Sequence, residues 1–218
     1  MARRFDLLIF DWDGTLSDST GIIVRTLRAA CRDFGLPEPS GEQARYVIGL
    51  ELSQALRHLF PDLPDERLPP LVARYRQRYL TDDEDVRPFA GIPELIGELH
   101  ASGYRLAVAT GKHRKGLERA LARSGLGAYF SSSRCVDECP SKPHPRMIEE
   151  LMGEFSTPAE RTLMIGDTTH DVRMAINAGV AALAVAYGAH PRAELVRLAP
   201  LACVDDVARL ALWLKRNA

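Results

Sequence analysis

Four aspartates stand in two short runs, each of which follows an apolar segment of the chain. Asp11 and Asp13 belong to the run Asp11-Trp12-Asp13-Gly14-Thr15-Leu16, and Asp167 and Asp171 belong to Gly166-Asp167-Thr168-Thr169-His170-Asp171. A single aspartate after a strand is usually a turn former or a helix N-cap. Four carboxylates gathered together repel one another, which destabilises a fold unless a cation binds or some carboxylates are protonated. Oxygen-rich clusters suit Mg²⁺, so the runs predict a magnesium site.

A threonine and two lysines add groups that bind anions. Thr110 stands with Gly111 and Lys112 after another apolar segment, and Lys142 lies just before a predicted helix. Backbone amides at a strand-to-helix turn and a compact lysine charge both suit phosphate. The Gly111-Lys112 pair is not a P-loop, because no glycine stands five residues before Gly111 and His113 replaces the required serine or threonine.

Other nucleophiles and cofactor motifs are missing from the sequence. No G-x-G-x-x-G fingerprint follows an apolar segment, and no G-x-S-x-G elbow is present. The remaining nucleophile is a carboxylate that attacks phosphorus and forms an acyl phosphate. Cys135 and Cys139 with the nearby His144 lack a fourth ligand at zinc spacing, so we expect the cysteines to be small buried hydrophobic residues.

The elements that must position these groups alternate along the chain. Continuous apolar segments at 7–10, 106–109, 163–165 and 182–186 are typical of strands buried on both faces, and amphipathic segments with helical spacing lie between them. This alternation predicts an α/β fold with a doubly wound parallel sheet and helices on both faces. Ligands bind beyond the carboxyl ends of such strands, where the aspartates and Thr110 stand.

The segment 17–85 interrupts this alternation with helical patterns and no convincing strand. We predict that it is an inserted all-helical cap domain, and that residues 1–16 and 86–218 form the α/β core domain. Two apolar stripes would pack its helices: Ile23, Leu27, Ala30 and Phe34, and then Leu68, Leu71, Val72, Tyr75 and Tyr79. We expect its arginines to form a solvated face: Arg67, Arg74, Arg76 and Arg78.

The composition excludes several classes of protein. With 218 residues, 46% hydrophobic and 26% charged, the chain resembles an ordinary globular protein. A net charge of -1 excludes a broadly basic nucleic-acid-coating protein. Asp6 and Asp11 bracket the short apolar run near the start, and no apolar stretch reaches the roughly 20 residues that span a bilayer. We therefore expect a cytoplasmic monomer or homodimer that binds neither nucleic acid nor membrane.

The motifs resemble, in order and spacing, the four motifs of the haloacid dehalogenase superfamily. The run Asp11 to Leu16, Thr110, Lys142 and the run Gly166 to Asp171 carry the resemblance, which extends from Phe5 to about Leu214. The helical insertion between the first two motifs resembles the phosphoglycolate-phosphatase-like subgroup. The resemblance implies a Mg²⁺-dependent phosphatase of a small phosphorylated metabolite, with 2-phosphoglycolate as the candidate substrate and an aspartyl-phosphate intermediate.

The resemblance also implies roles for the catalytic residues. Asp11 would be the nucleophile and a Mg²⁺ ligand. Asp13 would protonate the leaving oxygen, deprotonate the attacking water and lend its backbone carbonyl to the metal. Thr110 and Gly111 would hold phosphoryl oxygens, and Lys142 would neutralise Asp11 and the transferring group.

Further roles that the resemblance implies concern the metal and the substrate. Asp167 would bind Mg²⁺ directly, and Asp171 would bind it through water or orient Lys142. Lys112 would lie near the phosphate. The segment 47–52, with Gly49 and the flanking Arg45, resembles the substrate-specificity loop of the subgroup, although Gly49 could equally end a helix.

Alternatives to a phosphatase remain at this stage. Family members that cleave carbon–halogen bonds lack the second acid, Asp13, and those that cleave carbon–phosphorus bonds carry a cap lysine, whereas residues 17–85 contain no lysine. A phosphomutase acting on a sugar phosphate shares all four motifs. A catalytically silent binding module would have no need of a nucleophile, an acid and a metal site together.

Overall fold

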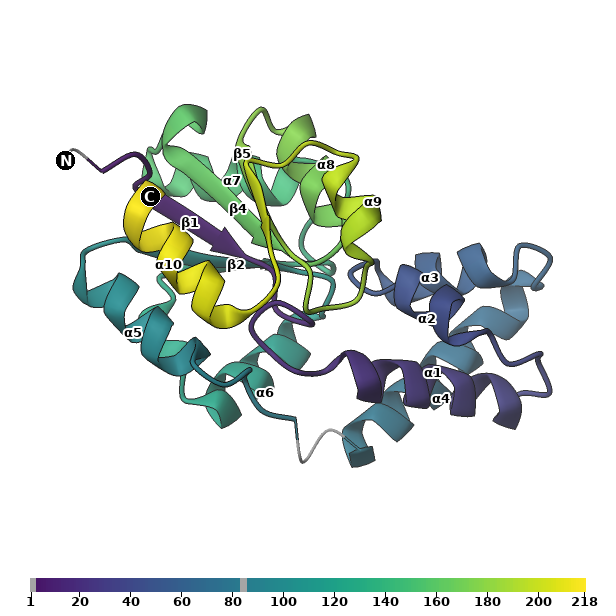
Figure 1. Cartoon of the computed structure of the whole chain (residues 1–218). Helices are drawn as coiled ribbons and strands as arrows, with labels where there is room; N and C mark the ends of the chain where they lie inside the picture. Colours follow the sequence, from purple (N-terminus) through teal and green to yellow (C-terminus); the bar gives the residue numbers. More distant parts are fainter. Residues whose placement is uncertain (1–2, 83–85) are drawn as a thin grey trace.

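A six-stranded parallel sheet forms the centre of the protein (Figure 1). The computed structural model describes residues 3–82 and 86–218. The strands lie in the order β3-β2-β1-β4-β5-β6, which is a doubly wound arrangement. Their bounds are β1 Leu7–Phe10, β2 Arg105–Thr110, β3 Ser132–Cys135, β4 Thr162–Gly166, β5 Ala181–Val185 and β6 Ala202–Val204. The predicted α/β fold is confirmed.

Helices cover both faces of the sheet, which explains the continuous apolar strands. Leu8 and Phe10 of β1 pack against α5 (Ile92–Ala101), α6 (Arg114–Ser124) and α10 (Val207–Asn217). Leu7 and Ile9 point to the opposite face and pack against α7 (Arg146–Phe155), α8 (Thr169–Asn177) and α9 (Arg192–Val196). Because successive side chains of a strand alternate between faces, a strand buried on both faces needs an apolar residue at every position.

The sequence patterns did not predict β3 and β6. These strands form the two edges of the sheet. β3 has the sequence Ser-Ser-Arg-Cys with three half-buried residues, and β6 is only three residues long. Edge strands are short and often polar because one side of the backbone has no neighbouring strand. Neither strand therefore carries the apolar run that marks β1 and β4.

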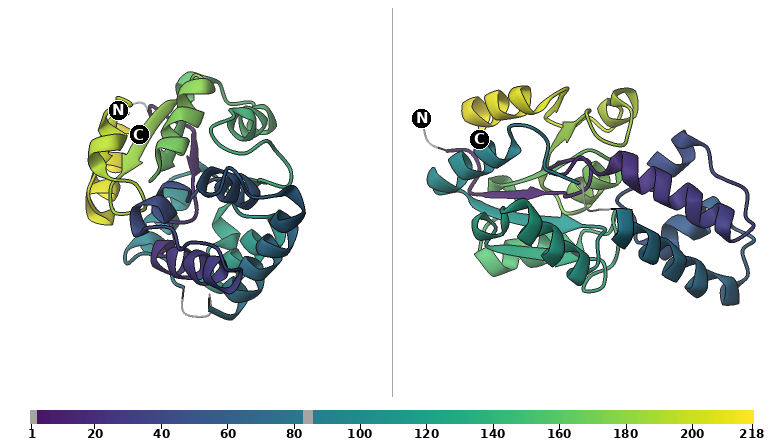
Figure 2. Two further views of the ribbon diagram at one scale, coloured as in Figure 1. Left: turned by 90° about the vertical axis from the view of Figure 1, so that its right-hand side faces the viewer. Right: turned by 90° about the horizontal axis from the view of Figure 1, so that it is seen from below.

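Four helices form an insertion between β1 and β2, and we call residues 20–82 the helical insertion. It comprises α1 (Thr20–Asp33), α2 (Gly41–Tyr46), α3 (Leu52–Leu59) and α4 (Leu68–Asp82), with the short 3₁₀ turn η1 (Asp65–Arg67) before α4. The right-hand view of Figure 2 shows it beyond one end of the sheet. The predicted boundary at residue 85 lies outside the described residues.

The helical insertion has a hydrophobic core of its own. Leu27, Ala30, Leu56 and Leu71 are buried in it, and α1 packs along α4. The chain leaves and re-enters the sheet side by side, since Ser17 forms an antiparallel bridge with Pro88. The predicted stripes are confirmed for Leu27, Ala30 and the α4 leucines, whereas Ile23 lies outside this hydrophobic cluster among the residues described. None of the helices that the structure describes is both long and apolar enough to cross a membrane.

Replacing Leu56 by alanine tests the core of the helical insertion. Leu56 is fully buried between α1, α3 and α4, so Leu56→Ala should lower the free energy of unfolding by about 2–5 kcal/mol. The control Leu212→Ala alters a side chain that is 48% exposed and should change stability by no more than about 0.5 kcal/mol. Urea unfolding followed by circular dichroism measures both, and equal losses in the two variants would contradict the packing described here.

Candidate active site

The site residues meet because they follow neighbouring strands. Asp11 and Asp13 follow β1, Thr110 ends β2, and Asp167 follows β4. β1 lies between β2 and β4 in the sheet, so these carboxyl ends share one edge. The arrow of β1 points toward the helical insertion, which lies next to this edge (Figure 1). The predicted gathering of the motifs is confirmed.

Lys142 joins two of the aspartates in the interior. Its Nζ donates to Oδ1 of Asp11 and to Oδ1 of Asp171, each at 2.6 Å, and all three side chains are at most 1% exposed. Burial raises the pKa of Asp11 to about 7, although the charge of Lys142 opposes this change. Burial would likewise raise the pKa of Asp171, but Lys142 lowers it below the usual value. Lys142 thus neutralises only part of the negative charge.

Asp167 completes an acidic cluster. Its Oδ1 accepts a hydrogen bond from the Thr15 hydroxyl at 2.9 Å, and its Oδ2 accepts from the backbone N–H of Ala189 at 2.7 Å. Burial, followed by the charges of Asp11 and Asp171, nevertheless raises the pKa of Asp167 well above its usual value. Ionisation of all three carboxylates would therefore place more negative charge in the cluster than its own hydrogen bonds offset.

The donor set of this cluster fits a divalent cation. Asp11, Asp167 and Asp171 each offer an oxygen, and these oxygens lie within 4.8 Å of one another. Oδ2 of Asp11 is buried and has no hydrogen-bond partner among the described residues. Hard oxygen ligands and uncompensated negative charge are what Mg²⁺ requires. The cysteines belong to no such ligand group in the described residues, and Cys31, Cys135 and Cys139 are buried as expected.

Asp13 lies outside the acidic cluster of Asp11, Asp167 and Asp171, and it lines a cavity. Its Oδ1 accepts a hydrogen bond from the Ser19 hydroxyl at 2.6 Å, and Lys112 Nζ lies 3.0 Å from its Oδ2. Gly14 follows with a φ of 83°, and a Cβ there would lie 2.2 Å from Oδ2 of Asp167. Glycine thus allows the turn that separates Asp13 from the acidic cluster while the backbone passes close to it.

Thr110, Gly111 and Lys112 form the turn after β2. The Thr110 hydroxyl accepts from the backbone N–H of Lys112 at 3.2 Å, and Lys112 Nζ donates to the hydroxyl of Tyr79 at 3.1 Å. Burial lowers the pKa of Lys112, but Asp13 and Tyr79 raise it further than burial lowers it. Lys112 is therefore a fixed positive charge between the core and the helical insertion.

The loop between α2 and α3 packs directly on this turn. A Cβ on Gly111 would lie 2.6 Å from the carbonyl oxygen of Gly49, and the backbone N–H of Glu51 donates to Oγ of Ser141 at 2.9 Å. Gly49 has a φ of 93° and lies in the turn beyond α2, which ends at Tyr46. The predicted specificity loop therefore lies beside the catalytic motifs.

Arg45 does not lie with the other predicted site residues. Its side chain is exposed and lines a separate hollow with Tyr46, His58 and His190. In this region the Tyr46 carbonyl contacts Nε2 of both His170 and His190, at 2.9 and 3.0 Å. The helical insertion turns Arg45 outward because Ala44 and Val47 face its hydrophobic core. These histidines join the insertion to the core.

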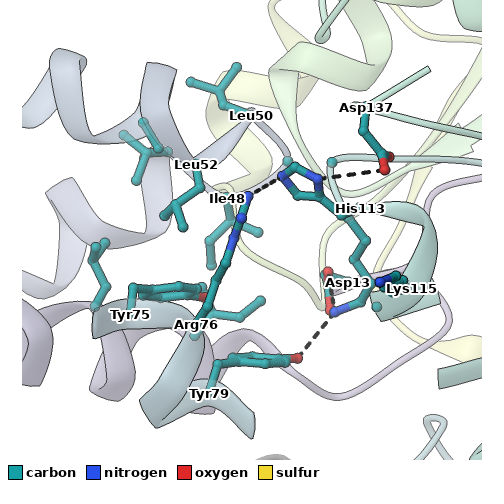
Figure 3. Close-up of a pocket in the computed structure, with 18 of the residues that line it drawn as sticks. Asp13, Ile48, Leu50, Leu52, Tyr75, Arg76, Tyr79, His113, Lys115 and Asp137 are labelled. Atoms are coloured by element: carbon teal, nitrogen blue, oxygen red, sulfur yellow. Dashed lines mark hydrogen bonds and ion pairs between the residues drawn. The ribbon is translucent and has the colours of Figure 1, made fainter. Parts of the chain in front are cut away.

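A cavity of about 550 Å³ lies between the helical insertion on one side and the core residues Asp11 and Asp13 on the other (Figure 3). Arg76 enters its lining and contacts Nε2 of His113, whose Nδ1 lies 3.6 Å from Asp137. Arg76 is exposed, as the predicted solvated arginine face requires, and it also lines the cavity. Arg74 and Arg78 instead pair with Asp33 on the insertion's surface.

Several hydroxyl groups that donate hydrogen bonds to the site aspartates were not predicted from the sequence. Ser19 stands at the N-cap position of α1, yet its hydroxyl binds Asp13 and makes no side-chain cap hydrogen bond. Thr15 binds Asp167 across the site. Thr168 caps α8 in a reciprocal capping box with Asp171. The box has a sequence signal in its three-residue spacing, whereas the Thr15 contact depends on tertiary folding.

A family model described as haloacid dehalogenase-like hydrolase matches residues 8–185. The chain belongs to this family. It is 36% identical to the probable phosphatase IndB of Dickeya dadantii over 94% of this chain and 91% of that protein. It is 30% identical to a phosphoglycolate phosphatase of Agrobacterium fabrum, over 94% of this chain and 90% of the relative.

Solved structures share the fold over nearly the whole chain. A predicted phosphoglycolate phosphatase from Haemophilus somnus superposes with a TM-score of 0.83 at 26% identity, covering 96% of this chain and 98% of that one. A haloacid dehalogenase-like hydrolase from Bacteroides fragilis superposes with a TM-score of 0.88 at 21% identity. The match covers 94% of this chain and 99% of that one. The family and fold resemblance is confirmed.

Mg²⁺ should stabilise this haloacid dehalogenase-like hydrolase through Asp167. At about 100 times the dissociation constant, a ligand that binds only the folded state adds about 2.7 kcal/mol of stability, or several degrees in Tm. Asp167→Asn should abolish this shift. The same substitution should also raise the Tm of the metal-free protein at pH 8. Folding raises the pKa of Asp167, so at a pH above the pKa that this group has in the unfolded chain, the carboxyl group opposes folding. Asparagine does not ionise and removes this cost.

Thermal unfolding in Mg²⁺ and in EDTA measures both effects. Asp206→Asn, a change at an exposed helix cap, is the charge-matched control and should keep the full Mg²⁺ shift. An undiminished shift in Asp167→Asn would exclude Asp167 as a metal ligand.

Proposed function

We propose that the protein is a Mg²⁺-dependent phosphatase that hydrolyses a phosphomonoester through an aspartyl-phosphate on Asp11. One observation carries this proposal: the buried Asp11 is held by Lys142 through one oxygen while its other oxygen lacks a hydrogen-bond partner among the described residues, and Asp13 lies at the same cavity. A nucleophile, a second acid and a charge-neutralising lysine are thus present together. The named phosphatases among its relatives support the same activity.

Asp11 and Asp13 would share the bond-making steps. A carboxylate oxygen of Asp11 attacks phosphorus, the bond from phosphorus to the leaving oxygen breaks, and Asp13 gives that oxygen a proton. Asp13 then takes a proton from the water that attacks the aspartyl-phosphate, which releases phosphate and regenerates both carboxyl groups. The hydrogen bond from Ser19 and the ion pair with Lys112 hold Asp13 at the cavity for both proton transfers.

The positive groups would stabilise the charge of the transferring phosphoryl group. Bound Mg²⁺ would supply Lewis-acid stabilisation of that charge, with Asp11, Asp167 and the Asp13 carbonyl as ligands. Lys142 holds Asp11 and Asp171 in position, and Thr110 with the Gly111 amide would hold phosphoryl oxygens. Asp171 would act mainly by orienting Lys142, which it contacts at 2.6 Å.

The helical insertion would act as the cap of this site. In the proposed division, residues 1–16 and 86–218 form the catalytic core and residues 17–85 the cap. The contacts of Gly49 with Gly111 and of Glu51 with Ser141 support this role, because they close the insertion over the site. The cytoplasmic location, the monomeric or homodimeric state and the absence of nucleic-acid binding stay predictions.

The relatives favour hydrolysis over the two alternatives. They are named as phosphatases, pyrophosphatases and a 5'-nucleotidase, which disfavours a phosphomutase. The intact acidic cluster disfavours a silent binding module, because repulsion among its buried carboxylates costs stability. 2-Phosphoglycolate is a candidate substrate because two relatives are named for it.

Phosphate release from a panel of phosphorylated compounds tests the function. The panel contains 2-phosphoglycolate, sugar phosphates, nucleoside monophosphates and pyrophosphate, each with Mg²⁺ and with EDTA. We expect Mg²⁺-dependent release from phosphomonoesters and none in EDTA. Release that persists in EDTA, or no release from any compound, would overturn the proposal.

Asp11→Asn should abolish turnover and leave the fold intact. The amide nitrogen and oxygen replace the carboxylate without a change of volume, but the nucleophile is lost. Wild-type protein should retain ³²P from a labelled substrate after acid quench, whereas Asp11→Asn should retain none. Equal labelling of the two proteins would place the covalent intermediate on another residue.

Asp13→Asn should slow the hydrolysis of alkyl phosphates by about 10²–10⁴-fold, because the acid–base group is lost. Aryl phosphates have better leaving groups, so their phosphorylation step should be slowed much less. Stopped-flow measurement of the burst phase with p-nitrophenyl phosphate separates this step from hydrolysis of the intermediate. Equal slowing of the phosphorylation step for alkyl and aryl phosphates would contradict the acid role of Asp13.

A further inference from the structure

The cavity beside Asp13 has walls of two different kinds. Its core side carries charged groups: Asp11, Asp13, Lys112, Lys115 and Arg119. Its other side is formed by the helical insertion and is almost wholly apolar, with Ile23, Ile48, Leu50, Leu52, Tyr75 and Tyr79. Figure 3 shows the tyrosines and leucines across the cavity from Asp13 and Lys115. The phosphate end of a substrate belongs at the charged side, so its leaving group must face the apolar wall.

Part of this apolar wall lies outside the hydrophobic clusters of the described residues. Leu27, from the same helix as Ile23, is buried in the hydrophobic core of the insertion. Ile23 and Ile48, in contrast, belong to none of the hydrophobic clusters found among the described residues, although both line the cavity. Ile48 is buried, with 3% of its surface exposed, whereas Ile23 is half-buried and meets the open cavity. Apolar surface that lines a cavity commonly marks a ligand site, so Ile23 is the side chain of the two that is best placed to contact a ligand.

The described part of the insertion contributes one charged residue to the lining, Arg76, which is exposed and contacts the ring of His113. The rest of the wall that the insertion forms offers no charged partner to an anionic leaving group among the described residues. A carboxylate placed against Ile23, Ile48 and Leu52 would lose its hydration without gaining an ion pair, which is costly. Lys115 and Arg119 belong to α6 on the core side.

The size of the cavity and the two stacked tyrosines in its lining favour a large aromatic group. About 550 Å³ falls within the roughly 300–1,000 Å³ typical of pockets for drug-sized ligands, so a two-carbon acid would leave most of the wall in contact with water. The rings of Tyr75 and Tyr79 lie nearly parallel, 19° apart in plane with centroids 5.9 Å apart. Aromatic side chains of this kind contact an aromatic ligand favourably through stacked or edge-on packing.

We propose that the substrate's leaving alcohol carries a large, uncharged aromatic body that contacts Ile23, Ile48 and the two tyrosines. This inference rests on the proposed phosphatase function and names the substrate class of the same site. It places 2-phosphoglycolate among the poor substrates, because the carboxylate of that molecule would face the apolar wall.

Three primary alkyl phosphates test the inference without large differences in leaving-group chemistry: 2-(1-naphthyl)ethyl phosphate, ethyl phosphate and 2-phosphoglycolate. The naphthylethyl ester should have a KM at least about tenfold below that of ethyl phosphate, since burial of the ring is the main difference between them. A KM equal to that of ethyl phosphate, or a higher kcat/KM for 2-phosphoglycolate, would overturn the inference and leave the phosphatase proposal intact. No hydrolysis of any ester would overturn both.

Substitutions in the apolar wall test whether the ring of the naphthylethyl ester contacts it. Ile23→Asn should raise the KM for the naphthylethyl ester about fivefold and leave kcat/KM for ethyl phosphate within about twofold, because the wall loses apolar contact with the ring alone. The control Ile176→Asn makes the same substitution on α8 at a residue that is 54% exposed and should change neither value.

A second variant keeps the test valid if Ile23→Asn does not fold. Leu80 lines the same cavity and is 51% exposed, so Leu80→Asn does not threaten the core of the insertion. It should also raise the KM for the naphthylethyl ester selectively. Unchanged KM values in both variants, or equal changes for the naphthylethyl and ethyl esters in both, would show that the ring does not contact this wall.

Discussion

The burial of three carboxylates at one edge of the sheet is the constraint on which the site depends. Asp11, Asp167 and Asp171 are almost completely buried, and burial together with mutual repulsion raises the pKa of Asp11 and of Asp167. Lys142 offsets part of this charge, and hydrogen bonds from Thr15 and the Ala189 amide offset a further part. The charge that remains would favour a bound cation, because a ligand that binds only the folded state stabilises it.

The sheet makes this arrangement rigid. Parallel strands bring their carboxyl ends to the same edge. Because β1 pairs with both β2 and β4, residues 98 and 155 positions apart become neighbours. Helices on both faces bury these strands completely and fix the directions in which the loops leave them. A catalytic group held by a buried strand end loses little further entropy when a substrate binds.

The helical insertion supplies a different kind of chemistry. Every phosphomonoester presents the same phosphoryl group to the core, so only the remainder of the molecule can distinguish one substrate from another. The insertion touches the core through the Gly49 carbonyl, the Glu51 amide and the Tyr46 carbonyl, and its apolar residues face the cavity between these contacts. In the proposed function, the charged groups at the strand ends would bind the phosphoryl group, and the hydrophobic wall would select the leaving group.

The sequence by itself determined the parts of this protein that depend on periodicity and on short spacing. Continuous apolar runs predict the central strands, because only strands buried on both faces need them. The edge strands β3 and β6 carried no such run. Only the tertiary structure decided that Thr15 reaches Asp167, that Ser19 binds Asp13 in place of capping α1, that Arg45 turns away from the site and that Ile23 faces the cavity. The reason is that the direction in which a helix presents each side chain depends on how elements distant in the sequence pack against it, and a local pattern does not contain that information.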